Sequence, residues 1–252
     1  RVNPLVRAGT DALLVPAARR AHRVITATEV ARAEIVEELG LPPGKIAIIP
    51  HGAHPPPTGL RDVAGVRARL DAGERPIVLA VGTNVEHKNH AALLAGIAAL
   101  DPGERPLLVI AGHGTDELAP RAAELGVDAR LLGGVSDEEL EDLYAAATVY
   151  ATATRHEGFG LPVIEAMGRG LPVVASDLPV LREVAGELGW YFTDPAGLAD
   201  TLRTLLAGGD EVERRRRLGL AAAQRFTWAA TAERTLAAYE AALSTITKTR
   251  FV

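Results

Sequence analysis

Two glutamates frame a glycine-rich string at residues 156–165, which reads His-Glu-Gly-Phe-Gly-Leu-Pro-Val-Ile-Glu. Gly158 and Gly160 allow backbone conformations and close approaches that side chains forbid, and Pro162 suits the first turn of a following helix. A loop of this kind directs backbone N–H groups and the positive end of a helix dipole toward one point. The string therefore predicts a binding site for an anion such as phosphate.

The two carboxylates indicate that the ligand carries more than phosphate. Glu157 stands just before the loop, and Glu165 follows early in the predicted helix. Both would repel a bare anion, but one carboxylate can accept two hydrogen bonds from a ribose diol while the other binds a sugar hydroxyl. The combination favours a nucleotide sugar. The simpler alternative, in which the glutamates only cap the helix, fits a bare Gly-x-Gly better than this longer string.

The loop needs a scaffold, and the chain predicts one from residue 76 onward. Apolar, β-branched runs alternate with segments of helical periodicity, and each run is apolar throughout. Such strands are covered on both faces, so the pattern predicts an α/β protein with a Rossmann-like, doubly wound parallel sheet. Strands are expected at 76–82, 106–112, 129–133, 148–153, 172–176 and 190–193, and helices at 89–100, from 120, 136–147, 161–169, 195–207 and 211–225.

Ligands of doubly wound sheets bind beyond the carboxyl ends of the strands. We therefore expect the chemistry of this protein in the loops that follow its strands. These loops are 82–88, 112–116, 133–136, 154–162 and 176–180.

The first 57 residues predict one further strand–helix–strand unit, with strands at 23–27 and 46–49 around a helix at 29–39. Three consecutive prolines at 55–57 predict a stiff, extended linker after it. Because a lone unit of this kind cannot bury both faces of its strands, we expect it to belong to a sheet that lies mostly outside this sequence.

Glu157 and Glu165 are separated by seven residues. In this context the string resembles the E-x7-E motif of the retaining GT-B glycosyltransferase family that includes phosphatidylinositol mannosyltransferases, sucrose synthases and bacterial glycogen synthases. The resemblance extends over roughly residues 20–243, and four further strings carry it. They are Val-Gly-Thr-Asn-Val-Glu-His-Lys-Asn at 81–89, Gly-Val-Ser-Asp-Glu-Glu-Leu-Glu-Asp-Leu-Tyr at 134–144, the strand–helix unit at 172–186, and Phe-Thr-Trp at 226–228.

The resemblance implies a division of the chain into three parts. Residues 1–57 would be the last part of an N-terminal, acceptor-binding Rossmann domain with its linker. Residues 58–226 would form the domain that binds the nucleotide sugar, and 227–252 a closing helix that crosses back toward the N-terminal domain.

The resemblance also implies roles at the donor site. Glu165 would hold the ribose hydroxyls, Glu157 would contact the transferred sugar, and Lys88 would neutralise the diphosphate leaving group, where a fixed cation stabilises developing charge. Main-chain atoms near Val135 would meet the base. Glu157 and Lys88 are the implied catalytic residues. The implied donor-binding residues are Gly82, Thr83, Lys88, Val135, Glu157, Gly158, Phe159, Gly160, Leu161 and Glu165.

The sequence departs from the family pattern at Thr83, where many members carry an arginine that meets the diphosphate, and at His87, where a related subgroup has arginine. Either Lys88 acts with less help, or His87 contributes when it is protonated. The alternative for Lys88 is a solvated residue at a helix start.

The implied activity is retaining, metal-independent transfer of a hexosyl group from a nucleotide diphosphate sugar to an acceptor hydroxyl, without a cofactor. The strings favour mannose from a GDP-linked donor over UDP-linked sugars, and the acceptor would be a saccharide or lipid-linked glycan of polysaccharide or glycolipid biosynthesis. One alternative is a nucleotide-binding module that is inactive without the N-terminal domain. Another is a nicotinamide dehydrogenase, but Glu117 replaces the third glycine of that fingerprint after Gly112 and Gly114.

Composition excludes several other classes. A net charge of −5 argues against nucleic acid as partner, and the absence of cysteine removes disulfides and thiolate chemistry. No apolar run is long enough to cross a membrane, and no signal peptide pattern is present, so we expect a cytoplasmic protein. The histidine pairs 51/54 and 87/90 lack further ligands for a metal. The arginine run 214–217 predicts a solvated helix face, or contact with anionic lipid at the inner membrane face.

Overall fold

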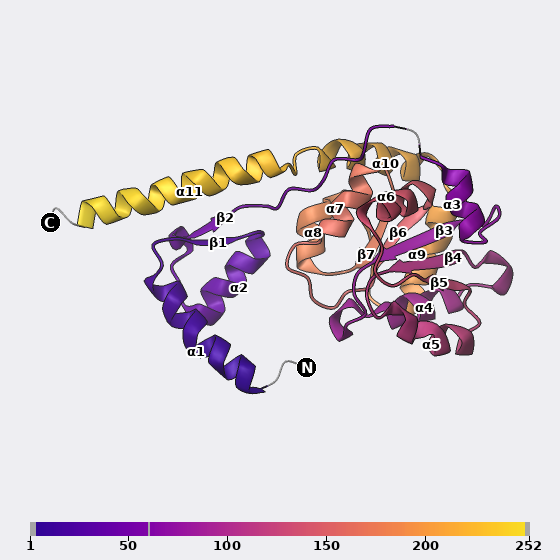
Figure 1. The fold of residues 1–252 in the computed structure, drawn as a ribbon, viewed down its shortest axis with the longest axis horizontal. Coiled ribbons are helices and arrows are strands. Elements are labelled where there is room, and N and C mark those ends of the chain that lie inside the picture. Colours follow the sequence, from indigo (N-terminus) through magenta and orange to yellow (C-terminus); the bar gives the residue numbers. More distant parts are fainter. Residues whose placement is uncertain (1–3, 60, 250–252) are drawn as a thin grey trace. The chain divides into compact units, whose positions relative to one another are not determined.

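The computed structural model describes residues 4–59 and 61–249, with side chains between 12 and 244. Residue contacts divide the chain into two units, Arg1–Gly52 together with Phe226–Val252, and Ala53–Arg225. Figure 1 shows the smaller unit built mainly from helices and the larger one built around a sheet.

The larger unit contains the predicted parallel sheet. Its strand order in the described chain is β5-β4-β3-β6-β7-β8, so the order reverses between β3 and β6. This reversal is the switch point at which doubly wound sheets bind ligands. Every strand lies within two residues of its predicted position, so the predicted fold class is confirmed. The strands are β3 (Ile77–Val81), β4 (Leu107–Ala111), β5 (Ala129–Leu131), β6 (Val149–Thr152), β7 (Val173–Ser176) and β8 (Trp190–Phe192).

Helices cover both faces of this sheet, as continuous apolar strands require. On one face, Val78 and Ala80 of β3 join a core with Leu94 of α4 and Leu198 of α9. On the other, α6 and α7 contact the sheet and pack against α3 and α10. The helices are α3 (Val63–Arg69), α4 (His90–Ala98), α5 (Ala119–Glu124), α6 (Asp137–Ala146), α7 (Leu161–Gly168), α8 (Pro179–Ala185), α9 (Pro195–Ala207) and α10 (Asp210–Ala223).

Helix α3 was not among the predicted elements. It spans seven residues, which is too short for a clear helical period. Its start is fixed instead by a cap, since Asp62 Oδ1 accepts a hydrogen bond of 2.9 Å from the Gly65 amide. Short 3₁₀ turns connect the other elements of this unit. They are η2 (Glu86–Lys88), η3 (Pro102–Glu104), η4 (Thr115–Leu118) and η5 (Gly186–Leu188).

The smaller unit contains the predicted strand–helix–strand arrangement. Strands β1 (Val24–Thr26) and β2 (Ile46–Ile48) pair in parallel, and α2 (Glu29–Leu39) and the 3₁₀ turn η1 (Pro43–Lys45) connect them. Thr28 caps α2 through its side chain, and Gly40 ends it in the left-handed conformation. The unit also holds α1 (Pro4–Arg20), which the sequence did not predict, and the long α11 (Trp228–Thr249).

The chain segment after β2 runs tightly past the start of α11 within this unit. Thr231 Oγ1 donates a hydrogen bond of 2.8 Å to the Pro50 carbonyl. A side chain at Gly52 would begin 2.3 Å from the Trp228 amide nitrogen, so only glycine fits there. The start of α11 is thereby attached to the N-terminal segment despite its distance in sequence.

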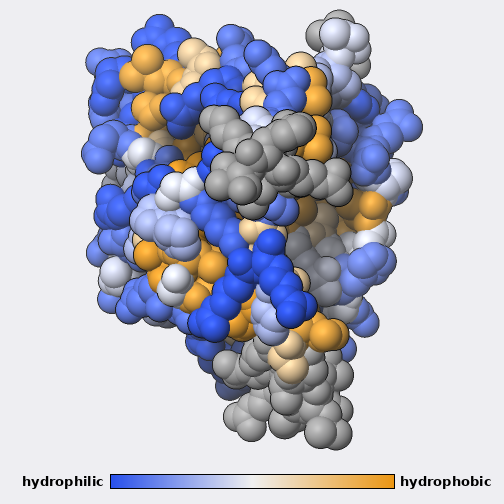
Figure 2. Space-filling model, turned by 90° about the vertical axis from the view of Figure 1, so that its left-hand side faces the viewer, coloured by the Kyte–Doolittle hydropathy of each residue, from blue (hydrophilic) through white to orange (hydrophobic). Residues whose placement is uncertain are grey.

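Apolar side chains remain exposed on the smaller unit. Ile25 of β1 is 41% exposed, and Leu236 of α11 is 58% exposed. Figure 2 shows hydrophobic side chains, coloured orange, at the surface among hydrophilic ones. A two-stranded sheet of this size cannot bury both of its faces. Over the described ranges, none of the helices combines the length and apolar character needed to span a membrane.

Candidate active site

Loops at the carboxyl ends of β3, β4 and β5 are joined by main-chain hydrogen bonds. The Gly82 amide donates to the Ala111 carbonyl at 2.9 Å, and the Gly112 amide donates to the Gly133 carbonyl at 2.6 Å. A side chain at Gly112 would begin 2.0 Å from the Gly82 carbonyl oxygen. Glycine is therefore required for the first two loops to approach this closely.

The loop after β3 is also joined to the loop after β6, across the switch point. Thr154 is fully buried, and its hydroxyl oxygen lies 2.8 Å from the His156 carbonyl oxygen and 3.1 Å from that of His87. The Arg155 amide donates to the His87 carbonyl at 2.7 Å, and Asn89 Nδ2 donates to the Ala153 carbonyl at 3.2 Å. These bonds bring the predicted phosphate-binding residues of both loops together.

Lys88 and Glu157 form an ion pair at this junction. Lys88 Nζ lies 2.6 Å from Glu157 Oε2, and the two side chains are 20% and 19% exposed. The lysine stem lies across Gly82, since a side chain there would begin 3.6 Å from Lys88 Cδ. A lysine ammonium has three donors, so Lys88 can hold Glu157 and still donate to a second anion.

The glycine-rich string forms the turn into α7, as predicted. Gly160 adopts φ 95° immediately before the helix, a conformation that favours glycine. Phe159 is buried and anchors the turn, whereas Gly158 is exposed and Leu161 half-buried. Pro162 occupies the first turn of α7, where its missing N–H is tolerated. The positive end of the α7 dipole therefore faces this loop.

Glu165 lies half-buried on α7. Tyr144 of α6 donates a hydrogen bond of 3.1 Å to its Oε2 atom. Burial raises the pKa of the Tyr144 hydroxyl well above its ordinary value, so this group stays a donor. The sequence identified Glu165 but not the tyrosine that contacts it.

Val135 lies half-buried in the loop between β5 and α6. A pocket of about 230 Å³ is lined there by Val135, Leu132 and Glu139. The predicted capping box fixes this loop, since the Ser136 amide donates to Glu139 Oε2 at 2.9 Å and the Glu139 amide donates to Ser136 Oγ at 3.2 Å. The Ser136 amide and the Ser136 hydroxyl both donate to the Glu139 carboxylate, which lowers the pKa of Glu139.

His90 supports the loop after β3 through a hydrogen bond to its main chain, and the sequence analysis did not identify it as a site residue. Its side chain is 4% exposed, and its Nε2 lies 3.0 Å from the Gly82 carbonyl oxygen. Burial lowers the pKa of His90, so the ring is neutral at pH 7 and Nε2 is the donor. Among the described residues, none bonds to its Nδ1.

Two residues of the same loop differ from His90 in their exposure to solvent. Thr83 and His87 are exposed on the same loop. The described side chains contain no group of three His, Cys, Asp or Glu residues that could hold a metal.

Two charged features from the sequence are engaged elsewhere. Asp177 pairs with Arg182, which lowers the pKa of the aspartate. The arginines of the 214–217 run lie close to glutamates of their own helix, Arg214 and Arg215 to Glu211, and Arg216 and Arg217 to Glu213.

Comparison with known proteins assigns these features to a family. A family model described as glycosyl transferases group 1 matches residues 66–225. The chain is 34% identical over 161 residues to the serotype-specific mannosyltransferase WbdA of Escherichia coli, covering 60% of this chain and 20% of that protein. It is 34% identical over 240 residues to the D-inositol 3-phosphate glycosyltransferase of Nocardia farcinica, covering 88% of this chain and 53% of that one.

Solved structures show the same fold. Anabaena HepE, crystallised with UDP and glucose, superposes with a TM-score of 0.80 at 21% identity, over 89% of this chain and 64% of that protein. The predicted GT-B class of fold is thus confirmed. The chain spans between a fifth and about half of the curated relatives described above.

Proposed function

The chain belongs to the group 1 glycosyl transferases, and from that premise we propose that it acts in transfer of a hexosyl group from a nucleotide diphosphate sugar to an acceptor hydroxyl. The observation that carries the proposal is the Lys88–Glu157 ion pair beside the α7 turn, with Glu165 on the same helix. The three side chains offer one cation for a diphosphate and two carboxylates for hydroxyl groups.

In the proposed complex, Lys88 donates to the diphosphate while it remains bonded to Glu157. As the bond to the sugar breaks, negative charge grows on the leaving diphosphate, and a fixed ammonium stabilises that charge. The amides and dipole of the α7 turn act on the same phosphate. Because these groups are held in place by folding, little reorganisation is needed during the reaction.

The two glutamates would then orient the sugars. Glu165 accepts hydrogen bonds from the ribose diol, and Glu157 accepts from a hydroxyl of the transferred sugar next to the reacting carbon. Main-chain atoms around Gly82, Thr83 and Val135 would complete the donor site. We propose that transfer retains the anomeric configuration and needs no metal or other cofactor.

For the donor we propose a GDP-linked mannose ahead of a UDP-linked sugar. Support comes from the mannosyltransferase WbdA of Escherichia coli among the relatives. HepE, in contrast, was solved with UDP, so both bases belong in the test.

For the acceptor we propose a saccharide or a lipid-linked glycan, with the protein in the cytoplasm and, for a lipid-linked acceptor, at the inner membrane face. The arginine run of α10 is not the membrane contact in this proposal, because its charges face glutamates of the same helix.

Calorimetric titration of UDP, GDP and ADP into the chain, beside a Glu165→Ala variant, tests the proposal. Loss of a hydrogen bond to a charged group typically costs about 1.5–3 kcal/mol, or roughly tenfold to a hundredfold in affinity. One nucleotide should bind, and the variant should weaken it by that factor. Failure of all three nucleotides to bind, or unchanged affinity in the variant, would contradict the assignment of Glu165.

A further inference from the structure

The Glu165 carboxylate is held from behind by a buried tyrosine. Tyr144 is 1% exposed and lies in the last turns of α6, whose first residues follow the Val135 loop. Its hydroxyl donates to Glu165 Oε2 at 3.1 Å. A carboxylate has about four acceptor positions, so this bond fixes the side chain while the remaining positions stay available to a ligand.

Tyr144 is in turn fixed by an arginine that connects α6 with α7. The Arg169 guanidinium lies 4.9 Å from the centre of the Tyr144 ring. Its Nε donates to Glu141 Oε2 at 2.7 Å, and its NH1 donates to the main-chain carbonyl of Glu165 at 3.0 Å. One side chain therefore contacts the tyrosine, the helix that carries it and the residue that the tyrosine orients.

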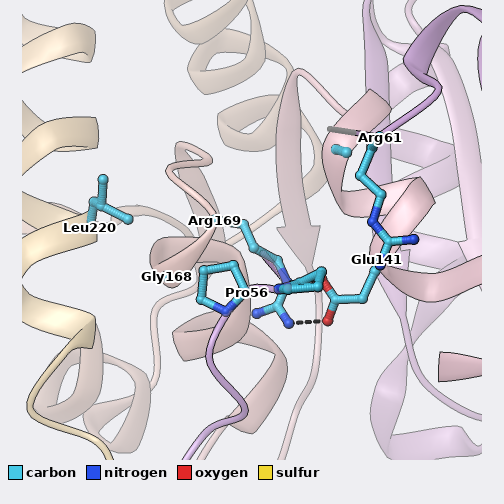
Figure 3. Close-up of a pocket in the computed structure, with 8 residues that line it drawn as sticks. Pro56, Arg61, Glu141, Gly168, Arg169 and Leu220 are labelled. Atoms are coloured by element: carbon cyan, nitrogen blue, oxygen red, sulfur yellow. Dashed lines mark hydrogen bonds and ion pairs between the residues drawn. The ribbon is translucent and has the colours of Figure 1, made fainter. Parts of the chain in front are cut away.

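Figure 3 shows Arg169 and Glu141 side by side in a pocket of about 300 Å³ that Pro56, Arg61 and Leu220 also line. The Arg169 side chain is only 7% exposed despite this pocket. The order from the pocket inward is thus the Glu141–Arg169 pair, the Tyr144 ring and the Glu165 carboxylate. This arrangement is more specific than core packing requires, because a buried phenylalanine would fill the same space without a donor.

We propose that Tyr144 is a positioning residue that holds the Glu165 carboxylate in the orientation that receives the ribose diol. The inference rests on the proposed function, since it assumes that Glu165 binds ribose. On this proposal, Tyr144 contributes to the preference for ribose over a dideoxy sugar although it does not touch the ligand.

The test compares Tyr144→Phe with Tyr150→Phe. The two tyrosines are both buried, and their rings lie 6.3 Å apart. The charges of Glu157 and Glu165 also act on the Tyr150 hydroxyl, but its hydrogen-bond partners are Thr152 and Val81. Each variant is titrated with UDP and GDP and with their 2′,3′-dideoxy counterparts, and melting temperatures confirm the fold. The measured quantity is the ratio of dideoxy to ribose dissociation constants, which a general loss of packing would leave unchanged.

Tyr144→Phe should reduce this ratio roughly three- to tenfold by weakening only the ribose nucleotide. This loss is smaller than that expected for Glu165→Ala, because the carboxylate that binds the ribose is still present. Tyr150→Phe should leave the ratio as it is. In a Glu165→Ala background, where the preference is already lost, Tyr144→Phe should have no further effect on the ratio.

The positioning role of Tyr144 and the ribose-binding role of Glu165 can be refuted separately. If Glu165→Ala abolishes the preference but Tyr144→Phe preserves it, or weakens both nucleotides equally, Tyr144 has no positioning role and the proposed donor site stands. If Glu165→Ala itself keeps the preference, or no nucleotide binds, the assignment of Glu165 to ribose is wrong and the inference falls with it.

Discussion

Replacement of Lys88 by methionine should weaken diphosphate binding far more than nucleoside binding. Methionine preserves most of the stem that lies across Gly82 but removes the ammonium. The loss of a charge-assisted hydrogen bond accounts for about 1.5–3 kcal/mol, or roughly tenfold to a hundredfold. Guanosine and uridine carry no phosphate, so their affinities should not change.

A second contribution to the loss of diphosphate affinity comes from Glu157, whose carboxylate loses its partner in the Lys88→Met variant. Glu157 is 19% exposed and lies 2.6 Å from Lys88 Nζ, so it would then face the diphosphate without compensation. Two like charges about 4 Å apart repel by about 4 kcal/mol at an effective dielectric constant near 20, and water at this partly exposed site reduces that value. We therefore expect a total loss of about a hundredfold or more for GDP or UDP.

The double variant Lys88→Met/Glu157→Gln measures the repulsion between the Glu157 carboxylate and the diphosphate. Because the amide removes the uncompensated charge, the double variant should bind the nucleoside diphosphate roughly tenfold more tightly than Lys88→Met alone, in line with coupling between neighbouring charges. Calorimetry measures the unchanged chain, Lys88→Met, Glu157→Gln and the double variant, and thermal melting checks that each is folded. Equal affinity of the double variant and Lys88→Met, or an equal loss for nucleoside and diphosphate, would refute the placement of the diphosphate beside this ion pair.

Three further changes test the scaffold. Gly160→Ala should destabilise the chain by about 1–3 kcal/mol in urea unfolding and weaken nucleotide binding, because φ is 95° and the new carbon would lie 3.0 Å from Leu181 Cδ2; Gly158→Ala is the matched control, with a change below about 0.5 kcal/mol. Ser136→Ala should cost about 1 kcal/mol through loss of the cap on α6, whereas equal stability would show that Glu139 alone holds that loop. Burial lowers the pKa of His90 from 6.5, so below that pH the unfolded chain binds a proton that the folded chain does not. The free energy of unfolding should therefore fall as pH drops below 6.5. If a His90→Gln variant showed the same dependence of the unfolding free energy on pH between about pH 7 and pH 5, His90 would be excluded as its source.

The sheet could be predicted because its strands are unambiguous in sequence. All five residues of β4 are buried, and a short, continuous apolar run rich in β-branched residues is typical of a strand covered on both faces. The start of α6 was equally clear, since the Ser136–Glu139 capping box is a local signal. Helix α3 is too short to show a helical period in sequence, and the sequence analysis did not predict α1.

The candidate site was predicted where the signal is local and missed where it depends on tertiary contacts. Glu157 and Glu165 stand out through their spacing around the glycines. Tyr144 and His90 do not, because a tyrosine or histidine in a helix is usually a packing residue, and only the structure shows which atom each contacts. The spacing of His87 and His90 by itself suits a metal pair, but the His90 ring binds the Gly82 carbonyl.

The hydrogen bonds that link the loops after β3, β4 and β5 have a consequence for the thermodynamics of binding. The protein's own main-chain bonds, from Gly82 to Ala111 and from Gly112 to Gly133, hold these loops together, so the loops lose little conformational freedom on nucleotide binding. Coupled loop folding would add a large negative heat-capacity change to the binding reaction. In this site the heat-capacity change should instead be small and follow only the surface that the nucleotide itself covers.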